Sequence, residues 1–232
     1  EGNLAWRAAK LLLDEKGIKD GVTIKIRKYI PVAAGMAGGS TDAAAVLVGV
    51  NRMFDLGFTK KELMERGVKL GADVPYCIMR GTALSEGIGE ILTELPAPPQ
   101  CHLVIAKPQI SVSTKAVYGK LRVNELAPEE HPDIDGMIRA IREKDLHRVA
   151  GKFGNVLELV TAGRYPVIGQ IEQAMLECGA ENAMMSGSGP TVFGLFTNPR
   201  AAEAAYEALR FGKYAKLAKQ VYLTGFYNVK RD

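Results

Sequence analysis

Residues 31–42 read PVAAGMAGGSTD and combine small side chains with two adjacent hydroxyls, just ahead of an apolar run. Gly35, Gly38 and Gly39 let the backbone curl so that several N–H groups can converge on one anion. The start of a helix adds unpaired N–H groups and a partial positive charge. The stretch therefore predicts a phosphate-binding loop, in which Ser40 and Thr41 cap the helix or contact a phosphate oxygen or a Mg²⁺ ion.

Two common phosphate and dinucleotide motifs do not match this loop. No lysine follows the glycines, as GxxxxGK[ST] requires, and the GxGxxG spacing is absent. From the loop alone, a glycine-rich turn with a serine cap and no ligand stays open as the alternative.

A carboxylate follows in the stretch GADVPY, residues 71–76. Asp73 there could act as a general base toward a reacting hydroxyl. The alternative is an aspartate that caps backbone N–H groups in a turn, which is a common role of aspartate beside glycine and proline.

A second glycine-rich stretch, MMSGSGPTVFG, covers residues 184–194. Gly187 and Gly189 could bring the backbone close to a ligand, or they could form an ordinary tight turn between two strands. Two weaker signals lie between these motifs: the turn SEGIGE at 85–90, and hydroxyls ahead of a helix that carries Tyr118 in KPQISVSTKAVY at 107–118. The three histidines are isolated, and we assign none of them a catalytic role.

Periodicity predicts the elements that position these residues. Helical spacing predicts helices over 3–16, 41–54 and 59–71, the last with a capping box of Thr59 and Glu62. Alternation predicts a strand over 22–30. Further along we expect short strands in 76–95, a strand over 101–108, a helix opening in 111–121, helices broken near 151 and 166, strand–turn–strand over 181–196, a helix over 199–212 and a strand over 218–229.

This mixed order lacks regular βαβ repeats and predicts an α+β protein with two packed lobes. The proline-rich stretch LPAPPQ, residues 95–100, is the expected boundary between them.

Composition limits the classes of function. The 232 residues are 47% hydrophobic, with a net charge of +4 and one tight basic run, NVKRD, at the end. That pattern is unlike a nucleic-acid-binding surface. The 3 widely spaced cysteines predict free thiols in a reducing compartment. Without a long apolar run or a signal peptide, we expect a cytoplasmic protein with no membrane partner.

Six stretches in register are similar to the GHMP kinase superfamily: NLAWRAAKLL, IPVAAGMAGGSTDAAAVL, GADVPY, SEGIGEIL, KPQISVSTKAVY and MSGSGPTVF. Together they resemble the branch that acts on a cytidine diphosphate derivative of a methylated four-carbon polyol, in the non-mevalonate route to isoprenoid precursors. The resemblance runs from Asn3 to Phe196.

The resemblance implies a two-lobe α+β GHMP kinase fold. Residues 1–95 would form an ATP-binding lobe like domain 2 of ribosomal protein S5, incomplete at its start, and residues 96–232 a ferredoxin-like C-terminal lobe. The oligomeric state would be a monomer or a homodimer.

The implied reaction is ATP-dependent phosphorylation of the 2-hydroxyl of the cytidine diphosphate substrate. Mg²⁺ would accompany the ATP, and Ser40 or Thr41 could contact this ion. Asp73 would be the base that takes the hydroxyl proton. The implied substrate contacts are Asp73, Ile88, Thr114 and Tyr118, with Tyr118 stacked on the cytosine. The implied ATP contacts are Asn3, Leu4, Pro31, Ala33, Ala34, Gly35, Met36, Ala37, Gly38, Gly39, Ser40, Thr41, Gly187 and Ser188.

The sequence departs from the family at its beginning. An N-terminal strand with a lysine and an asparagine, and a Tyr-His pair at the cytidine site, have no counterpart here. The resemblance therefore predicts missing N-terminal strands and weak or absent catalysis by the chain as given. The alternatives are another small-molecule kinase of the superfamily, for instance on homoserine or mevalonate, a nucleotide-binding module without catalysis, and an α+β binding domain without a nucleotide.

Overall fold

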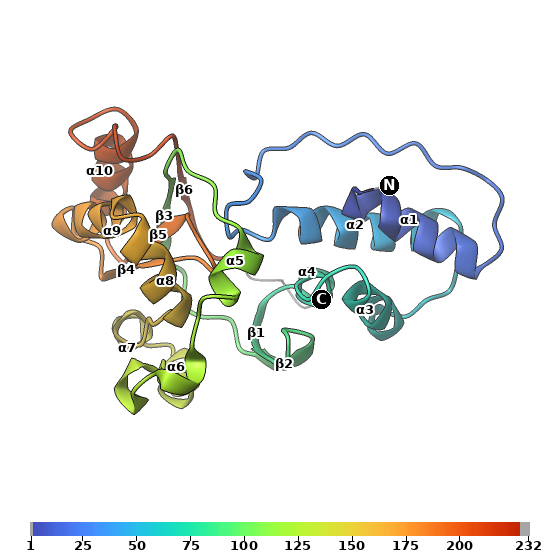
Figure 1. The fold of residues 1–232 in the computed structure, drawn as a ribbon, viewed down its shortest axis with the longest axis horizontal. Coiled ribbons are helices and arrows are strands. Elements are labelled where there is room, and N and C mark those ends of the chain that lie inside the picture. The colour runs from blue at the N-terminus through green and yellow to red at the C-terminus, as the bar shows by residue number, and fades with distance from the viewer. Residues whose placement is uncertain (1, 228–232) are drawn as a thin grey trace. The chain divides into compact units, whose positions relative to one another are not determined.

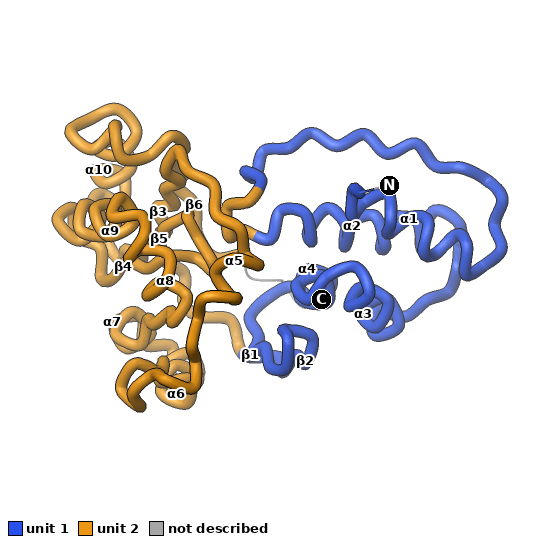
Figure 2. The backbone as a smooth tube through the Cα atoms, in the orientation of Figure 1, with its two compact units in different colours: residues 1–32, 37–95, 229–232 blue, residues 33–36, 96–228 orange. Residues whose placement is uncertain are grey.

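The structure is a computed structural model that describes residues 2–227. The described chain divides into two compact units (Figure 2). Unit 1 comprises residues 2–32 and 37–95, and unit 2 comprises residues 33–36 and 96–227. Four residues of the glycine loop, 33–36, therefore pack with the C-terminal part of the chain rather than with the segments that flank them.

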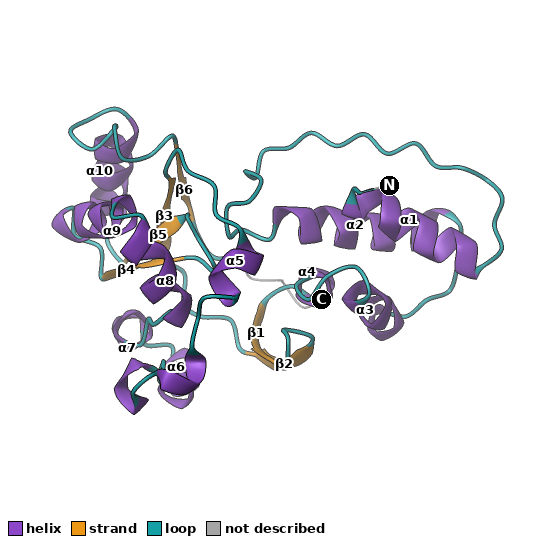
Figure 3. Cartoon of the chain, viewed as in Figure 1, coloured by secondary structure: helices purple, strands orange, loops and turns teal. Residues whose placement is uncertain are grey.

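Unit 1 is mainly helical (Figures 1 and 3). The side chain of Asn3 accepts a hydrogen bond from Ala5 N–H at 2.9 Å and opens the first helix. Thr59 and Glu62 form the predicted capping box at the third. The elements are α1 (Leu4–Glu15), α2 (Gly38–Met53), α3 (Lys60–Val68), α4 (Val74–Met79) and a hairpin of β1 (Thr82–Glu86) and β2 (Ile91–Leu95).

Small side chains let the helices of unit 1 pack closely. Ala8 and Leu12 of α1 and Ala43 and Leu47 of α2 are fully buried in one apolar cluster, which Val74 of α4 joins. Burial of this size is what stabilises helices that would be marginal on their own. The cluster holds the start of α2 and the start of α4 in one unit.

Two sequence expectations in unit 1 are wrong. Residues 22–30 form no strand, although they alternate as predicted, because no other strand in the described part of the chain pairs with them. Residues 76–79, expected to be extended, belong to α4 because Pro75 sits in its first turn, where a proline fits a helix.

Unit 2 is built on a four-stranded antiparallel sheet. Its strands are β3 (His102–Lys107), β4 (Asn182–Met185), β5 (Val192–Phe196) and β6 (Gln220–Thr224), in the order β4-β5-β3-β6. Helices connect β3 to β4 and β5 to β6 in a βαββαβ succession. This arrangement confirms the ferredoxin-like lobe.

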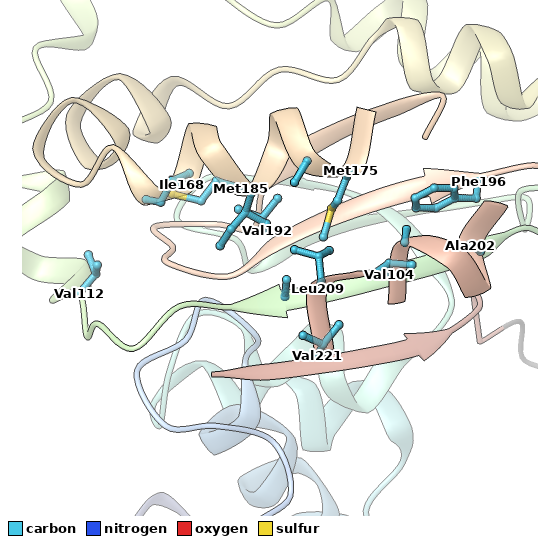
Figure 4. Packing of buried hydrophobic residues seen from close by; sticks show 14 of the residues in the cluster. Val104, Val112, Ile168, Met175, Met185, Val192, Phe196, Ala202, Leu209 and Val221 are labelled. Atoms are coloured by element: carbon cyan, nitrogen blue, oxygen red, sulfur yellow. The ribbon is translucent and has the colours of Figure 1, made fainter. Parts of the chain in front are cut away.

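The helices of unit 2 cover the sheet. Breaks occur near residues 151 and 166, as predicted. α9 packs against β4 and β5, and α10 against β3 and β6, with Met175, Met185, Val192 and Leu209 buried between them (Figure 4). The helices are α5 (Thr114–Tyr118), α6 (Ile134–Glu143), α7 (Leu146–Gly151), α8 (Val156–Arg164), α9 (Val167–Glu177) and α10 (Pro199–Arg210), with short 3₁₀ turns η1 (Val123–Glu125) and η2 (Pro128–Glu130).

The predicted strands at 101–108 and 181–196 are confirmed, and so is the helix that starts at Pro199. The final strand is confirmed over 220–224, whereas residues 228 and 229 of that prediction lie outside the described residues, as does the basic run that ends the chain. Within the described part of the chain, no helix is long and apolar enough to span a membrane.

Candidate functional site

The backbone of the glycine loop alternates in handedness. Ala33, Gly35 and Ala37 have φ of 52°, 69° and 47°, and the residues between them do not have positive φ. Such alternation turns successive N–H groups toward one side and forms a concavity that suits an anion. An alanine in this region is strained by about 1–2 kcal/mol, and such strain is often kept where a site needs it.

Helix α2 begins at Gly38, three residues earlier than the sequence predicts. Ser40 and Thr41 therefore lie in its first turn, and neither is the N-cap. The N-cap Ala37 offers no side-chain acceptor, and the Thr41 hydroxyl turns back to donate to Ala37 O at 3.0 Å. The N–H groups of the first turn thus lack a side-chain cap, which is the arrangement that an anion-binding helix start needs.

The start of α1 lies beside this turn. A Cβ placed on Gly39 would be 3.6 Å from Leu4 Cδ1, so Leu4 and its neighbour Asn3 lie near the start of α2, and their role on the adenine side stays a prediction. The sequence interpretation missed Lys28, whose Nζ donates to Gly38 O at 3.1 Å and to Asp42 Oδ2 at 2.6 Å. Residues 22–30 alternate as in a strand, and this pattern gives no indication that Lys28 contacts a helix.

Asp73 is the N-cap residue of α4, and its side chain makes no capping hydrogen bond. The side chain is exposed, so the alternative of a capping aspartate has no support in this geometry. Nearby, burial raises the pKa of the Cys77 thiol, Thr41 lowers it, and the charge of Asp73 raises it further. Because Cys77 Sγ lies 3.5 Å from Thr41 Oγ1, Asp73 and the first turn of α2 share one corner of unit 1.

Ile88 lies at the tip of the β1–β2 hairpin and is 73% exposed. Its N–H donates to Glu90 Oε2 at 2.8 Å, which shapes the turn. A Cβ on Gly89 would come within 3.6 Å of Ala72 O, so the tip lies against the residue that precedes Asp73. Unit 1 thus gathers the helix start, Asp73 and the Ile88 turn.

Within unit 2, the two glycine-rich stretches meet. The Ser186 hydroxyl donates to Gly35 O at 2.8 Å. A Cβ on Gly35 would overlap the carbonyl oxygen of Ser186, and Gly35 also has the positive φ that favours glycine. The contact requires a glycine for two independent reasons. The sequence interpretation did not single out Ser186, because only the tertiary contact identifies it.

Ser188 and Thr114 also meet. Their hydroxyls are 2.9 Å apart, and Ser188 is only 6% exposed. Ser113 caps α5, accepting from Ala116 N–H at 3.4 Å, and Tyr118 at the end of that helix is 60% exposed. The structure thus joins one residue predicted for ATP to one predicted for the substrate, and leaves an aromatic ring free to stack.

A buried lysine supports the segment that leads to α5. Lys107 is 8% exposed, and its Nζ donates to Pro108 O at 3.2 Å and to Ile110 O at 2.9 Å. Burial, and to a lesser degree Lys219, lower the pKa of its ammonium group. The two bonds fix the path of the chain from β3 toward Thr114.

Comparison with known proteins defines the class. A model of the GHMP kinase N-terminal domain matches residues 3–81, and a model of the GHMP kinase C-terminal domain matches residues 124–215. A crystal structure of homoserine kinase from Cytophaga hutchinsonii is similar in fold, with a TM-score of 0.83 at 22% identity, over 97% of this chain and 76% of that one. The fold and the two glycine motifs are those of a GHMP kinase.

The sequence relatives narrow the class. The 4-diphosphocytidyl-2-C-methyl-D-erythritol kinase of Lachnoclostridium phytofermentans is 53% identical over 99% of this chain and 77% of its own length. That of Lachnospira eligens is 54% identical over 97% and 76%. A crystal structure of 4-(cytidine 5'-diphospho)-2C-methyl-D-erythritol kinase superposes with a TM-score of 0.79 at 31% identity, over 97% of this chain and 78% of that one. The chain belongs to the 4-diphosphocytidyl-2-C-methyl-D-erythritol kinase family, whose members are small-molecule kinases that use ATP.

Proposed function

We propose that this protein transfers the γ-phosphoryl group of ATP to the 2-hydroxyl of 4-diphosphocytidyl-2-C-methyl-D-erythritol, in the synthesis of isoprenoid precursors. The observation that carries the proposal is the 53% identity to a kinase of that name over 99% of this chain. The arrangement of residues within each unit supports it.

The glycine loop and the start of α2 would hold the ATP phosphates. The positive φ angles at Ala33, Gly35 and Ala37 and the absence of a side-chain cap at Ala37 favour backbone N–H groups as the phosphate donors. Asn3, Leu4 and the residues from Pro31 to Thr41 would line this part, and Gly187 and Ser188 would support it.

Mg²⁺ would neutralise charge on the ATP phosphates when bound. Hydroxyl oxygens in the first turn of a helix suit a hard cation of this kind. Either Ser40 or Thr41 could take this role, because the Thr41 hydroxyl uses its hydrogen to donate to Ala37 O at 3.0 Å and keeps its oxygen lone pairs for a cation.

Asp73 would take the proton of the substrate's 2-hydroxyl as the hydroxyl oxygen attacks the γ-phosphorus of ATP and ADP leaves. Phosphoryl transfer depends mostly on positioning and charge neutralisation, and the carboxylate of Asp73 is exposed at the start of α4, where a substrate hydroxyl could reach it. Its side chain makes no capping bond that the reaction would have to break.

On the substrate side, Tyr118 would stack on the cytosine and Thr114 would contact the diphosphate region. Ile88 would provide an apolar contact near the base. We also propose a cytoplasmic location, where ATP and reduced thiols coexist, and no nucleic-acid or membrane partner; the protein would act as a monomer or a homodimer.

The test is substrate-dependent ADP release, measured by a coupled assay with 4-diphosphocytidyl-2-C-methyl-D-erythritol. Homoserine and mevalonate serve as competing acceptors, since other GHMP kinases of this fold carry those names. We expect release only with the cytidyl substrate. Turnover of homoserine or mevalonate instead, or ATP binding with no turnover of any acceptor, would contradict the proposal.

A further inference from the structure

Asn155, the N-cap residue of α8, bonds to the backbone on both sides of Ser186. Its Nδ2 donates to Met185 O at 2.9 Å and to Gly187 O at 2.8 Å, while its Oδ1 caps the helix. The Ser186 hydroxyl in turn donates to Gly35 O at 2.8 Å. One path of hydrogen bonds therefore leads from the start of α8, through Ser186, to the glycine loop.

Thr161, in the middle of α8, bonds to the next serine along the chain. Its side chain is buried, and its Oγ1 donates to Ser188 O at 3.2 Å. Its methyl group packs against the same turn, since a Cβ placed on Gly189 would lie 3.4 Å from Thr161 Cγ2. The Ser188 hydroxyl lies 2.9 Å from Thr114 Oγ1 at the start of α5. A second path therefore leads from α8, through Ser188, to Thr114.

The two paths end at different parts of the predicted site. The path through Ser186 ends at the loop that is predicted to hold the ATP phosphates. The path through Ser188 ends at Thr114, which is predicted to contact the diphosphate region of the substrate. All the residues of both paths belong to unit 2. Hydrogen bonds from a helix of this kind hold a contacting group in the geometry that binding needs.

We propose that Asn155 and Thr161 are positioning residues with different targets. Asn155 sets the position of Ser186 and, through it, of the glycine loop. Thr161 sets the position of Ser188 and, through it, of Thr114. The consequence for the binding of ATP and of the substrate rests on the proposed function, whereas the consequence for the backbone rests on these contacts alone.

Calorimetric titrations of the intact protein, with ATP and separately with the cytidyl substrate, test the two targets without turnover. Asn155→Asp keeps the cap acceptor and removes both amide donors, and Thr161→Val keeps the shape of the side chain and removes its donor. We expect each variant to weaken binding of its own ligand about fivefold, the effect of roughly one lost hydrogen bond.

The order of the two effects is the decisive result. Asn155→Asp should raise Kd for ATP more than Kd for the substrate, and Thr161→Val should reverse this order. A general loss of folded protein would change both Kd values alike. Equal effects on the two ligands in either variant, or no effect on the expected ligand, would overturn the proposal.

Double-mutant cycles show whether the two residues act through the serines. In Ser186→Ala the hydroxyl that bonds to Gly35 O is already absent, so adding Asn155→Asp should raise Kd for ATP little further. The second cycle combines Ser188→Ala with Thr161→Val and measures Kd for the substrate. Fully additive effects in either cycle would show that the residue does not act through its serine, which contradicts the proposal.

Thr191→Val is the matched control for Thr161→Val. Thr191 is fully buried too, but its Oγ1 has no hydrogen-bond partner among the described residues. Both Kd values should therefore stay at the wild-type level. A loss of affinity for the substrate as large as in Thr161→Val would mean that the bond to Ser188 is not the cause, and would overturn the proposal.

Three further variants guard against side effects. Thr161→Ser keeps the donor and should bind the substrate as the wild type does. If Thr161→Val does not fold, Thr161→Cys replaces it, because a thiol of similar size donates only weakly and should give the same result. Asn155→Ser keeps a cap acceptor, lacks the amide donors and adds no charge, so it should match Asn155→Asp. Wild-type affinity for ATP in Asn155→Ser would contradict the proposal.

Hydrogen exchange of the ligand-free protein separates this inference from the proposed function. Two backbone N–H groups near the start of α5 donate to the carbonyl of Ser113, and displacement of Thr114 should expose them. We expect the peptide that covers residues 113–119 to exchange several-fold faster in Thr161→Val and unchanged in Asn155→Asp. That result in a protein that does not bind the cytidyl substrate would leave the inference standing and reject the proposed function. Unchanged exchange in Thr161→Val would overturn the inference.

Discussion

Asp73 is an exposed carboxylate at the first turn of α4 with no capping bond, close to the helix start that carries the glycine loop. We expect Asp73→Asn to lower kcat by about 10²- to 10⁴-fold, the range that a lost general base produces. The Kd for ATP should be unchanged, because the substitution leaves the loop intact. Steady-state kinetics and calorimetric titration of ATP measure the two effects.

The exposed Asp20→Asn is the control for this substitution and should leave kcat unchanged. Turnover of Asp73→Asn near the wild-type rate would remove Asp73 from the mechanism.

Position 35 accommodates glycine but no larger residue without a steric clash. An alanine there would overlap Ser186 O and would have to adopt a φ near 69°. We expect Gly35→Ala to separate the two glycine stretches and to raise KM for ATP at least tenfold, with a larger effect on KM than on kcat. Unchanged affinity for ATP would mean that the loop is only a turn.

Gly49→Ala supplies the matched control, since a Cβ at this position inside α2 meets nothing within 4 Å. Replacing a glycine inside a helix by alanine stabilises by about 0.5–1 kcal/mol. The variant should therefore melt slightly higher than the wild type and bind ATP as the wild type does.

At the scale of elements, Asn155 both caps helix α8 and holds the backbone of residues 185–188. Asn155 accepts from Leu157 N–H at 3.1 Å as the N-cap, and its amide donates to the carbonyls of Met185 and Gly187. Asn155→Asp keeps the cap and removes both donors, so we expect the helix to persist while the 185–188 segment loosens. KM for ATP should rise several-fold, and circular dichroism should show unchanged helix content.

Asn198 at the start of α10 is the comparison for that substitution. Its Oδ1 accepts from Arg200 N–H at 2.9 Å and from Ala201 N–H at 3.3 Å, which an aspartate can also do. Asn198→Asp should be neutral or slightly stabilising, because a negative charge suits a helix start. Equal effects of Asn155→Asp and Asn198→Asp on KM for ATP would mean that the amide donors of Asn155 do not position the 185–188 segment.

At the scale of the whole molecule, opposite pKa shifts set the pH of maximum stability. Hydrogen bonds from Arg66 to Glu15, from Thr59 to Glu62, from Lys152 to Asp133 and from Tyr214 to Glu177 are the largest causes that lower the pKa of those carboxyls. Groups with a lowered pKa stabilise the fold fully above their unfolded pKa, and this contribution is lost as pH falls through the folded value.

Glu172 acts in the opposite direction. Its pKa is raised from 4.5 to about 8, so its contribution is complete below pH 4.5 and is lost as pH rises through about 8. We expect the melting temperature measured by scanning calorimetry to peak near pH 5 and to fall toward pH 9. In Glu172→Gln the fall between pH 5 and pH 9 should become clearly shallower, whereas the acid side should not change. An identical slope in both proteins would show that Glu172 titrates normally.

The sequence by itself determined the local features of this protein. These features depend on residues only a few positions apart, so the sequence pattern predicts them directly. They include the helix caps at Asn3 and at Thr59 with Glu62, the strand–turn–strand around Gly187 and the helix that begins at Pro199. The same holds for the composition of the phosphate loop and for the six motifs that indicated the family.

Only the tertiary structure decided which distant groups meet. Residues 22–30 alternate like a strand, yet a strand exists only where a partner takes its hydrogen bonds. Ser186 reaches Gly35 across 151 residues of sequence, and Asn155 and Glu158 reach Met185 across 30 and 27 residues, which no spacing in the sequence expresses. The raised pKa of Glu172 depends likewise on the tertiary structure, because burial is its largest cause and no local pattern in the sequence expresses burial.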